Sequence, residues 1–122
     1  MPYIRSVAKP LVSVIETKAY LADAAKLMSE AERESVVDLL AADPECGDVI
    51  RGGGGIRKVR VPLAGRGKSG GARVIYYFHS RTVPVFLLTV FAKNRQDDLS
   101  DAQRNGYAKI AKAVAREYGE GE

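Results

Sequence analysis

The chain has 122 residues, which is enough for one domain with its own hydrophobic core and leaves little room for a second. Hydrophobic residues make up 46% of it and charged residues 28%, a balance that is typical of globular proteins and excludes a disordered chain. One cysteine and one histidine exclude an internal disulfide and the usual soft ligands of a structural zinc site. We therefore expect a reduced, cytoplasmic protein without a metal or other cofactor.

The charges are unevenly distributed along the chain. The formal net charge is only +4, yet residues 49–96 contain ten basic residues and no acidic one. A basic middle segment between acidic flanks indicates a polyanionic partner. The basic residues of this segment are Arg51, Arg57, Lys58, Arg60, Arg66, Lys68, Arg73, Arg81, Lys93 and Arg95.

The first half of the chain predicts one strand followed by two helices. Residues 11–15 are short and rich in β-branched side chains, which favours a strand. Apolar residues recur at helical spacing over residues 19–28. Ser29 and Glu32 fit a capping box that begins a second helix, and Pro44 ends it because proline disfavours helical geometry in the preceding residue. The short connection between the helices predicts an antiparallel hairpin.

The second half predicts a sheet and one further helix. Residues 48–51 are a candidate short strand, and residues 56–63 alternate apolar and basic side chains. Residues 72–79 and 83–93 are almost continuously hydrophobic, which favours two central strands covered on both faces. Residues 100–118 carry an apolar stripe at helical spacing and begin with a second capping box.

These elements give the order β-α-α-β-β-β-α, which is that of a small α+β domain with a mainly antiparallel sheet. We assign residues 11–118 to the domain and residues 1–10 and 119–122 to terminal tails. The longest apolar run, residues 83–92, is about half as long as the roughly 20 residues that a membrane span needs. Charges interrupt the N-terminus where a signal peptide has its apolar core, so we expect neither membrane insertion nor export.

Four basic residues of the predicted sheet are candidates for a functional site. Lys58 and Arg60 are two positions apart in one strand and therefore share a face. Arg73 begins the next strand and Lys93 ends the last, and neighbouring strands lie about 4.8 Å apart. Such a cluster binds a phosphate backbone and stabilises the negative charge of a phosphoryl-transfer transition state. The alternative is a solvated sheet face without a function.

Three further features have a functional and a structural interpretation. Tyr76 lies in a run of three aromatic residues and either stacks on a base or donates a proton, or else belongs to the core. His79 is either an acid or base or an exposed turn residue. Residues 65–70 satisfy the pattern G-x-G-x-x-G, but a strand follows where a dinucleotide site needs a helix, which argues against such a site.

The stretches PECGDVIRGGGGIRKVR (44–60), GKSGGARVIYY (67–77), AKN (92–94) and DLS (98–100), in this order, resemble the HigB-like branch of the RelE/ParE toxin superfamily. The resemblance covers about residues 11–116. It implies a toxin of a type II toxin–antitoxin system with a small α+β fold. It further implies a metal-independent endoribonuclease that cleaves messenger RNA in the ribosomal A site, beside 16S rRNA, with the RNA 2′-hydroxyl as nucleophile. The implied partner is a helix-turn-helix antitoxin, through which alone the toxin reaches operator DNA.

The resemblance also assigns roles to individual residues. Arg60 and Arg73 stabilise the phosphate, Lys58 is the candidate base, and Lys93 aligns with a basic residue at the end of the last strand. Leu99 stands where RelE has a C-terminal catalytic tyrosine, so the general acid stays open among Lys93, Tyr76 and His79. Four of the six remaining basic residues of this segment are left to hold RNA or the ribosome: Arg57, Arg66, Lys68 and Arg95. Arg51 and Arg81 have no specific assignment.

Two other functions remain open at this level. The first is inhibition of DNA gyrase without nuclease activity, as in the ParE branch. The second is a degenerate toxin that only binds its antitoxin and RNA.

Overall fold

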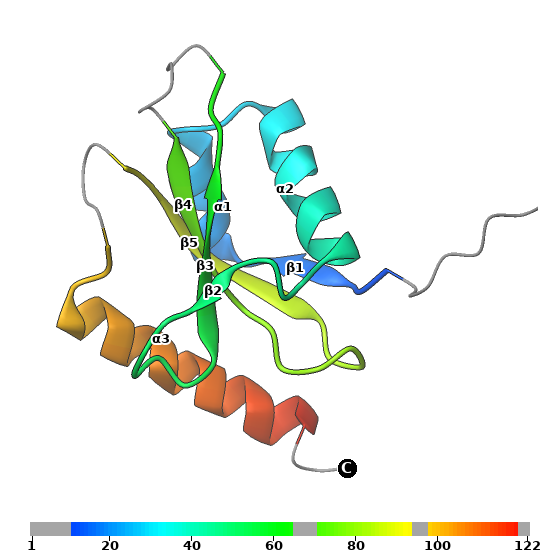
Figure 1. The fold of residues 1–122 in the computed structure, drawn as a ribbon, viewed down its shortest axis with the longest axis vertical. Helices are drawn as coiled ribbons and strands as arrows, with labels where there is room; N and C mark the ends of the chain where they lie inside the picture. Colours follow the sequence, from blue (N-terminus) through cyan, green and yellow to red (C-terminus); the bar gives the residue numbers. More distant parts are fainter. Residues whose placement is uncertain (1–10, 65–70, 94–97, 120–122) are drawn as a thin grey trace, which may run out of the picture.

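The computed structural model describes residues 11–64, 71–93 and 98–119 and forms a five-stranded sheet with helices on both faces (Figure 1). The strands lie in the order β1-β5-β4-β3-β2; β1 runs parallel to β5, and every other pair is antiparallel. This arrangement confirms the predicted α+β class. The strands are β1 (Val14–Glu16), β2 (Asp48–Val49), β3 (Ile56–Val61), β4 (Ala72–Tyr77) and β5 (Val85–Ala92). The helices are α1 (Lys18–Ala25), α2 (Glu30–Ala42), α3 (Asp101–Val114) and the π-helical turn η1 (Ala115–Gly119).

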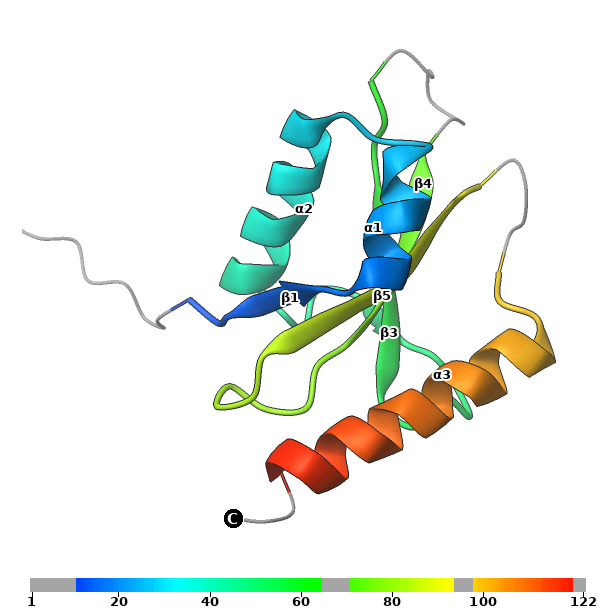
Figure 2. The same cartoon turned by 180° about the vertical axis from the view of Figure 1, so that it is seen from behind.

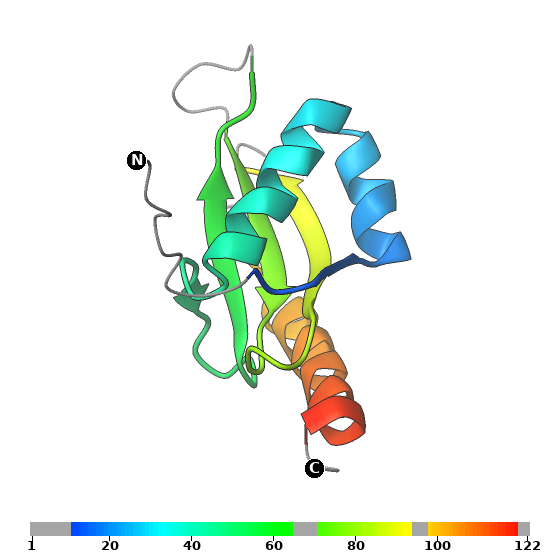
Figure 3. The same cartoon turned by 90° about the vertical axis from the view of Figure 1, so that its right-hand side faces the viewer.

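The sheet is the middle layer, with α1 and α2 on one face and α3 on the other (Figures 2 and 3). Side chains of alternate strand residues make the two cores. Val74 and Tyr76 of β4 pack with the α1 and α2 residues Tyr20 and Leu40. Ile75 and its neighbours on the other face pack under α3. None of the helices in the described part of the chain has the length and hydrophobicity needed to cross a membrane.

The strand boundaries differ from the predicted ones for identifiable reasons. The first strand was expected at residues 11–15 but begins at Val14, because Val12 donates its N–H to the carbonyl of Ala41 in α2 instead of a strand. Proline sets two other limits: Pro62 follows the last residue of β3, and Pro84 precedes the first residue of β5. The candidate short strand is present as β2 and adds a fifth strand to the predicted four.

The predicted capping boxes are both present. Ser29 and Glu32 exchange side-chain and backbone hydrogen bonds at the start of α2, and Ser100 and Gln103 do so at the start of α3. The first helix is shorter than expected and ends at Ala25, because the chain turns there toward α2. The last helix is α-helical only to Val114 and continues as η1, which extends it to the predicted end.

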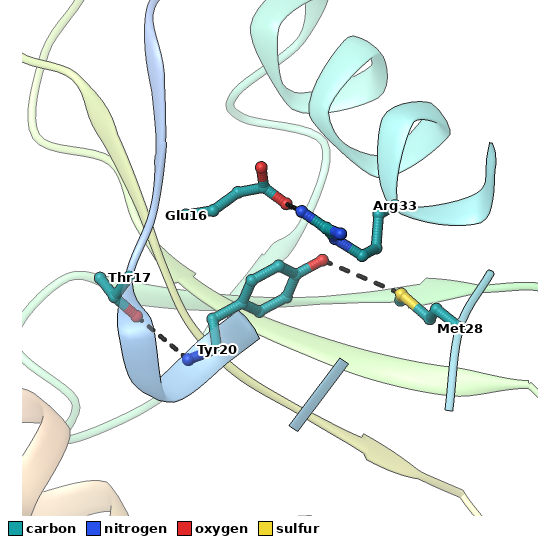
Figure 4. A network of polar contacts seen from close by, with 5 residues as sticks. All are labelled: Glu16, Thr17, Tyr20, Met28 and Arg33. Atoms are coloured by element: carbon teal, nitrogen blue, oxygen red, sulfur yellow. Dashed lines mark hydrogen bonds and ion pairs between the residues drawn. The ribbon is translucent and has the colours of Figure 1, made fainter. Parts of the chain in front are cut away.

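A small polar network connects β1 with the two helices above it (Figure 4). The ion pair between Arg33 and Glu16 spans 3.3 Å, and the fully buried Tyr20 hydroxyl lies 3.9 Å from the sulfur of Met28. Thr17 caps α1 by accepting the N–H of Tyr20 at 3.2 Å. Burial, with a smaller contribution from Glu16, raises the pKa of Tyr20 to about 12.

Because the buried Tyr20 phenol has a raised pKa, we expect the free energy of unfolding to decrease at alkaline pH. Between about pH 10 and pH 12 the unfolded chain releases the phenol proton while the folded chain keeps it, so the stabilisation is lost as the pH rises. We expect the free energy of unfolding of the wild type to fall by roughly 1 kcal/mol more than that of Tyr20→Phe between pH 9 and pH 11. Urea titrations of both proteins measure this difference, and parallel pH profiles would contradict the prediction.

Candidate functional site

Lys58 and Arg60 lie on the α3 face of β3, as the alternating pattern predicts. Their neighbours on that face include the buried Ile56, whereas Val59 and Val61 point into the core beneath α1 and α2. α3 crosses the sheet near the start of β3, and the other end of β3 extends beyond it (Figure 1). Arg60 is consequently exposed, and the Lys58 side chain retains 30% of its accessible surface.

Arg73 is the direct cross-strand partner of Arg60. The register between β3 and β4 pairs these two residues, so their β-carbons lie on the same face, about 5 Å apart. Like charges in this position repel one another, and an anion between them relieves the repulsion. The Nη1 atom of Arg73 is buried and has no hydrogen-bond partner among the described residues. A buried, unpaired guanidinium N–H is costly, and a phosphate oxygen would satisfy it.

Asp98 completes this cluster from the segment before α3. Its Oδ2 atom accepts a hydrogen bond from Lys58 Nζ at 2.7 Å, and its Oδ1 atom accepts the backbone N–H of Leu99 at 2.8 Å. The hydrogen bond from Lys58 is the largest cause of a lowered pKa of the Asp98 carboxyl, and the charge of Arg73 adds to it. Asp98 is therefore ionised at neutral pH, and the site holds a carboxylate among its cations.

Sequence reasoning missed the role of Asp98, although its motif was recognised. Residues 58 and 98 are 40 positions apart, and nothing local indicates that they meet. The signal available was indirect: Asp98 is the second of two adjacent acids, Asp97 and Asp98, that follow a 48-residue stretch, 49–96, that has none.

The remaining predicted site residues have different positions. Lys93 follows β5 at the same end of the sheet, where its backbone N–H bonds to the carbonyl of Gly71 at 3.1 Å. Its position is two residues beyond Phe91, the cross-strand partner of Arg73. Three residues predicted to hold RNA or the ribosome lie outside the described residues: Arg66, Lys68 and Arg95.

The structure does not bring Tyr76, His79 or Arg57 to this site. Tyr76 is fully buried on the opposite face, and its burial raises the pKa of the phenol far above the ordinary value. His79 follows the other end of β4, with Nδ1 3.2 Å from the Tyr77 hydroxyl. Arg57 points to the α1 and α2 face and donates to the carbonyls of Glu45 and Gly47 at 3.1 and 2.9 Å, so it holds the turn before β2.

Cavities lie both at the cluster and away from it. One of about 230 Å³ adjoins Lys58 and Asp98. A larger one of about 370 Å³ lies between α2 and the end of β3, lined mainly by apolar side chains such as Val36 and Leu63. No basic residue lines the larger cavity, and it is separate from the cluster of Lys58, Arg60, Arg73 and Asp98. Within the described ranges, no group of three histidine, cysteine or acidic side chains is arranged to hold a metal ion.

Comparisons with known proteins agree with the fold and its position in a family. Residues 45–120 match the family model described as the RelE toxin of the RelE/RelB toxin–antitoxin system. Among solved structures, the chain is similar to a double arginine-to-alanine mutant of the E. coli toxin RelE in the free state. That match has a TM-score of 0.54 at 18% sequence identity and covers 82% of this chain and 96% of the other. At this identity the structural match supports the fold alone, whereas the family model covers more than half of the chain.

Proposed function

The chain belongs to the RelE toxin family of type II toxin–antitoxin modules, and from this premise we propose that it is a metal-independent endonuclease of messenger RNA on the ribosome. Within the family we propose the HigB-like branch, on the order of the motifs from residue 44 to residue 100. The observation that carries the proposed activity is the pairing of Arg60 with Arg73 beside Lys58 and Asp98, because the buried Nη1 atom of Arg73 has no hydrogen-bond partner among residues 11–64, 71–93 and 98–119.

The first part of the reaction is recognition of the scissile phosphate. In our proposal a nonbridging oxygen accepts hydrogen bonds from Arg73 and Arg60, and the phosphate charge relieves their mutual repulsion. These donors are strongest when the phosphate gains negative charge in the transition state, because the sheet holds them in place before the reaction. Lys58 approaches the same phosphate and releases Asp98 in doing so.

The second part is proton transfer. Release from Lys58 removes the main cause of the lowered pKa of Asp98, so the carboxylate becomes a stronger base when the substrate binds. We assign to Asp98 the proton of the 2′-hydroxyl, a task that sequence reasoning gave to Lys58. The 2′-oxygen then forms a bond to phosphorus while the bond to the 5′-oxygen breaks. The leaving 5′-oxygen takes a proton from Lys93, which leaves a 2′,3′-cyclic phosphate and a 5′-hydroxyl.

Asp98→Asn tests this assignment of the base. The amide keeps the size and one acceptor of the side chain but takes up no proton at neutral pH, so we expect ribosomal cleavage to slow by roughly 100-fold. RNA affinity should not decrease, because the substitution removes a negative charge. Single-turnover cleavage and RNA binding are measured separately, with Asp38→Asn on the exposed side of α2 as the control. Unchanged cleavage by Asp98→Asn would exclude it as the base.

The activity itself is tested by mapping RNA ends. After expression without an antitoxin, we expect new RNA 5′ ends within translated codons, and purified ribosomes should be needed for the same cuts in vitro. DNA damage without such cuts would favour gyrase inhibition instead. Growth without arrest, together with antitoxin binding, would indicate a degenerate toxin.

We further propose that the partner is a helix-turn-helix antitoxin encoded beside this chain. The toxin would reach operator DNA only through it, while its own basic cluster contacts messenger RNA and 16S rRNA. Co-expression of the adjacent reading frame should restore growth, and the protein that it encodes should co-purify with the toxin. An adjacent frame without this effect would contradict the proposed module.

A further inference from the structure

A β-bulge interrupts β5 halfway along its length. The register between β4 and β5 shifts between Ile75 and Tyr76, which makes Leu88 an extra residue on β5. The bulge breaks the alternation of side chains across this strand. Leu88 and Phe91 both belong to the core beneath α3, although residues three positions apart in a regular strand face opposite sides.

This break decides which face the end of β5 presents to the proposed site. Phe91 is the cross-strand partner of Arg73, so the two side chains share a face. Lys93 lies two positions further, and its N–H continues the ladder to the carbonyl of Gly71 at 3.1 Å. Alternation therefore directs the Lys93 side chain to the face of Arg73. An unbroken alternation from Leu88 onward would direct it to the opposite face, where α1 and α2 lie.

A hydrogen bond from α1 fixes the bulge. The hydroxyl of Thr89, directly after the extra residue, donates to Oδ2 of Asp23 at 2.6 Å, and α1 packs against β5 (Figure 2). Thr89 is buried, with only 8% of its surface exposed, so its hydroxyl would be costly to leave without a partner. A carboxylate acceptor makes this hydrogen bond a strong one. The ladder from β1 ends at Leu87, before the bulge, and therefore does not fix it.

We propose that Asp23 and Thr89 are positioning residues for the proton donor of the cleavage reaction. By holding the bulge from the α1 side, their hydrogen bond keeps the ammonium group of Lys93 on the other face, beside the phosphate at Arg73. The inference rests on the proposed function, in which Lys93 protonates the leaving 5′-oxygen. It adds that a helix on the opposite side of the sheet sets the geometry of this proton transfer. A displacement of about 1 Å in a reacting group is enough to slow a reaction by on the order of 100-fold.

Amide hydrogen exchange tests the structural part of this proposal without any need for catalysis. Thr89→Val keeps the shape of the side chain and removes the hydroxyl. The Lys93 amide reports on the end of β5 through its hydrogen bond in the ladder, and we expect it to exchange roughly tenfold faster in Thr89→Val and in Asp23→Ala. The Val85 amide, which bonds to the Ser13 carbonyl before the bulge, should keep its rate. An unchanged Lys93 amide in both variants would overturn the proposal.

Cleavage of RNA with two different leaving groups tests the catalytic part. One substrate carries the natural 5′-oxygen at the scissile phosphate, and in the other a sulfur atom replaces this oxygen. The oxygen needs a proton to leave, whereas a thiolate leaves without one because thiols are much stronger acids than alcohols. On ribosomes we expect Thr89→Val to slow cleavage of the oxygen substrate by roughly 10- to 100-fold and of the sulfur substrate by less than about threefold. Lys93→Ala should show the same dependence on the leaving group.

Matched variants separate positioning from a general loss of structure. Thr89→Ser keeps the hydroxyl and should cleave both substrates as the wild type does. Glu16→Gln removes a different contact on the α1 and α2 face, the ion pair with Arg33, and should change neither the Lys93 amide nor the ratio of the two rates. Asp23→Ala, at a half-buried position outside the two cores, makes the same test if Thr89→Val folds poorly. Equal slowing of both substrates by Thr89→Val and Asp23→Ala would overturn the proposal.

The two readouts also distinguish this proposal from the proposed function. A wild type that cuts no messenger RNA on ribosomes would contradict the nuclease, and the Lys93 amide would still decide whether α1 fixes the end of β5. A wild type that cuts, with a leaving-group dependence in Lys93→Ala but none in Thr89→Val, would overturn the positioning role alone.

Discussion

Replacing Lys58 and Arg73 together by alanine should abolish growth arrest and slow messenger-RNA cleavage by at least about 1,000-fold. Removal of a single preorganised donor to a developing oxyanion costs roughly 100- to 1,000-fold, and this double variant removes two charged donors from one phosphate. Arg60 would remain, but without the paired geometry that the register between β3 and β4 provides.

The same double variant should remain folded. Arg73→Ala removes a like-charge neighbour of Arg60 and a buried donor that has no partner among the described residues. Lys58→Ala loses a partly exposed ion pair with Asp98 that is worth about 1 kcal/mol or less, so we expect the melting temperature of the double variant to stay close to that of the wild type. The matched control is Lys109→Ala with Arg116→Ala, which loses the same charge from exposed positions beyond the cluster. The control should arrest growth as the wild type does. Persistent arrest by the double variant would contradict the proposed site.

Tyr76→Phe should show the opposite behaviour, with a large loss of stability and little change in cleavage. The fully buried Tyr76 hydroxyl accepts the N–H of Gly47 and donates to the carbonyl of Pro44, each at 2.8 Å. Phenylalanine leaves both backbone groups buried without this partner, which should cost roughly 2 to 4 kcal/mol of unfolding free energy. Urea titration measures this loss, and Tyr118→Phe, whose side chain is partly exposed in η1, should change stability by less than about 0.5 kcal/mol.

A second variant tests the same contact from the other side. A β-carbon on Gly47 would lie 2.7 Å from both the Tyr76 hydroxyl oxygen and the Lys58 carbonyl oxygen, so Gly47→Ala should displace the ring and the backbone of β3 and destabilise the protein. Because both changes break one interaction, the losses in the double variant should be smaller than their sum. Cleavage by Tyr76→Phe, measured well below its melting temperature, should stay within about threefold of the wild type. A 100-fold loss of cleavage at unchanged stability would instead identify Tyr76 as the proton donor.

The sequence predicted correctly those features that depend on residues close together in the chain. Side chains alternate across a strand, so the pairing of Lys58 and Arg60 on one face followed from their spacing alone. Both capping boxes follow from two residues three positions apart, because the hydrogen bonds that make them lie within one turn. Pro62 marks the end of β3 and Pro84 the beginning of β5, although the predicted strands extended past both prolines.

Long-range geometry decided the rest. The sequence does not set the register that places Arg73 opposite Arg60, because the glycine-rich segment between their strands is compatible with several turn lengths. Tyr76 was ambiguous for a related reason: in a run of aromatic residues, a shift of one position exchanges the buried face for the open one. Arg104 shares α3 with other basic residues, and nothing in the local sequence indicates that its side chain lies against Gly52.

The parallel pairing of β1 with β5 affects how quickly this protein folds after synthesis. The Thr17 hydroxyl, directly after β1, donates a hydrogen bond to the carbonyl of Leu87, which is 70 positions later in the chain. The first strand therefore cannot pair in the sheet until β5 has been synthesised. Contacts over such a distance require a large loop to close before they contribute stability, which slows folding. Asp98 and α3 come later still in synthesis. A nascent chain therefore lacks an assembled site until almost all of it has left the ribosome that makes it.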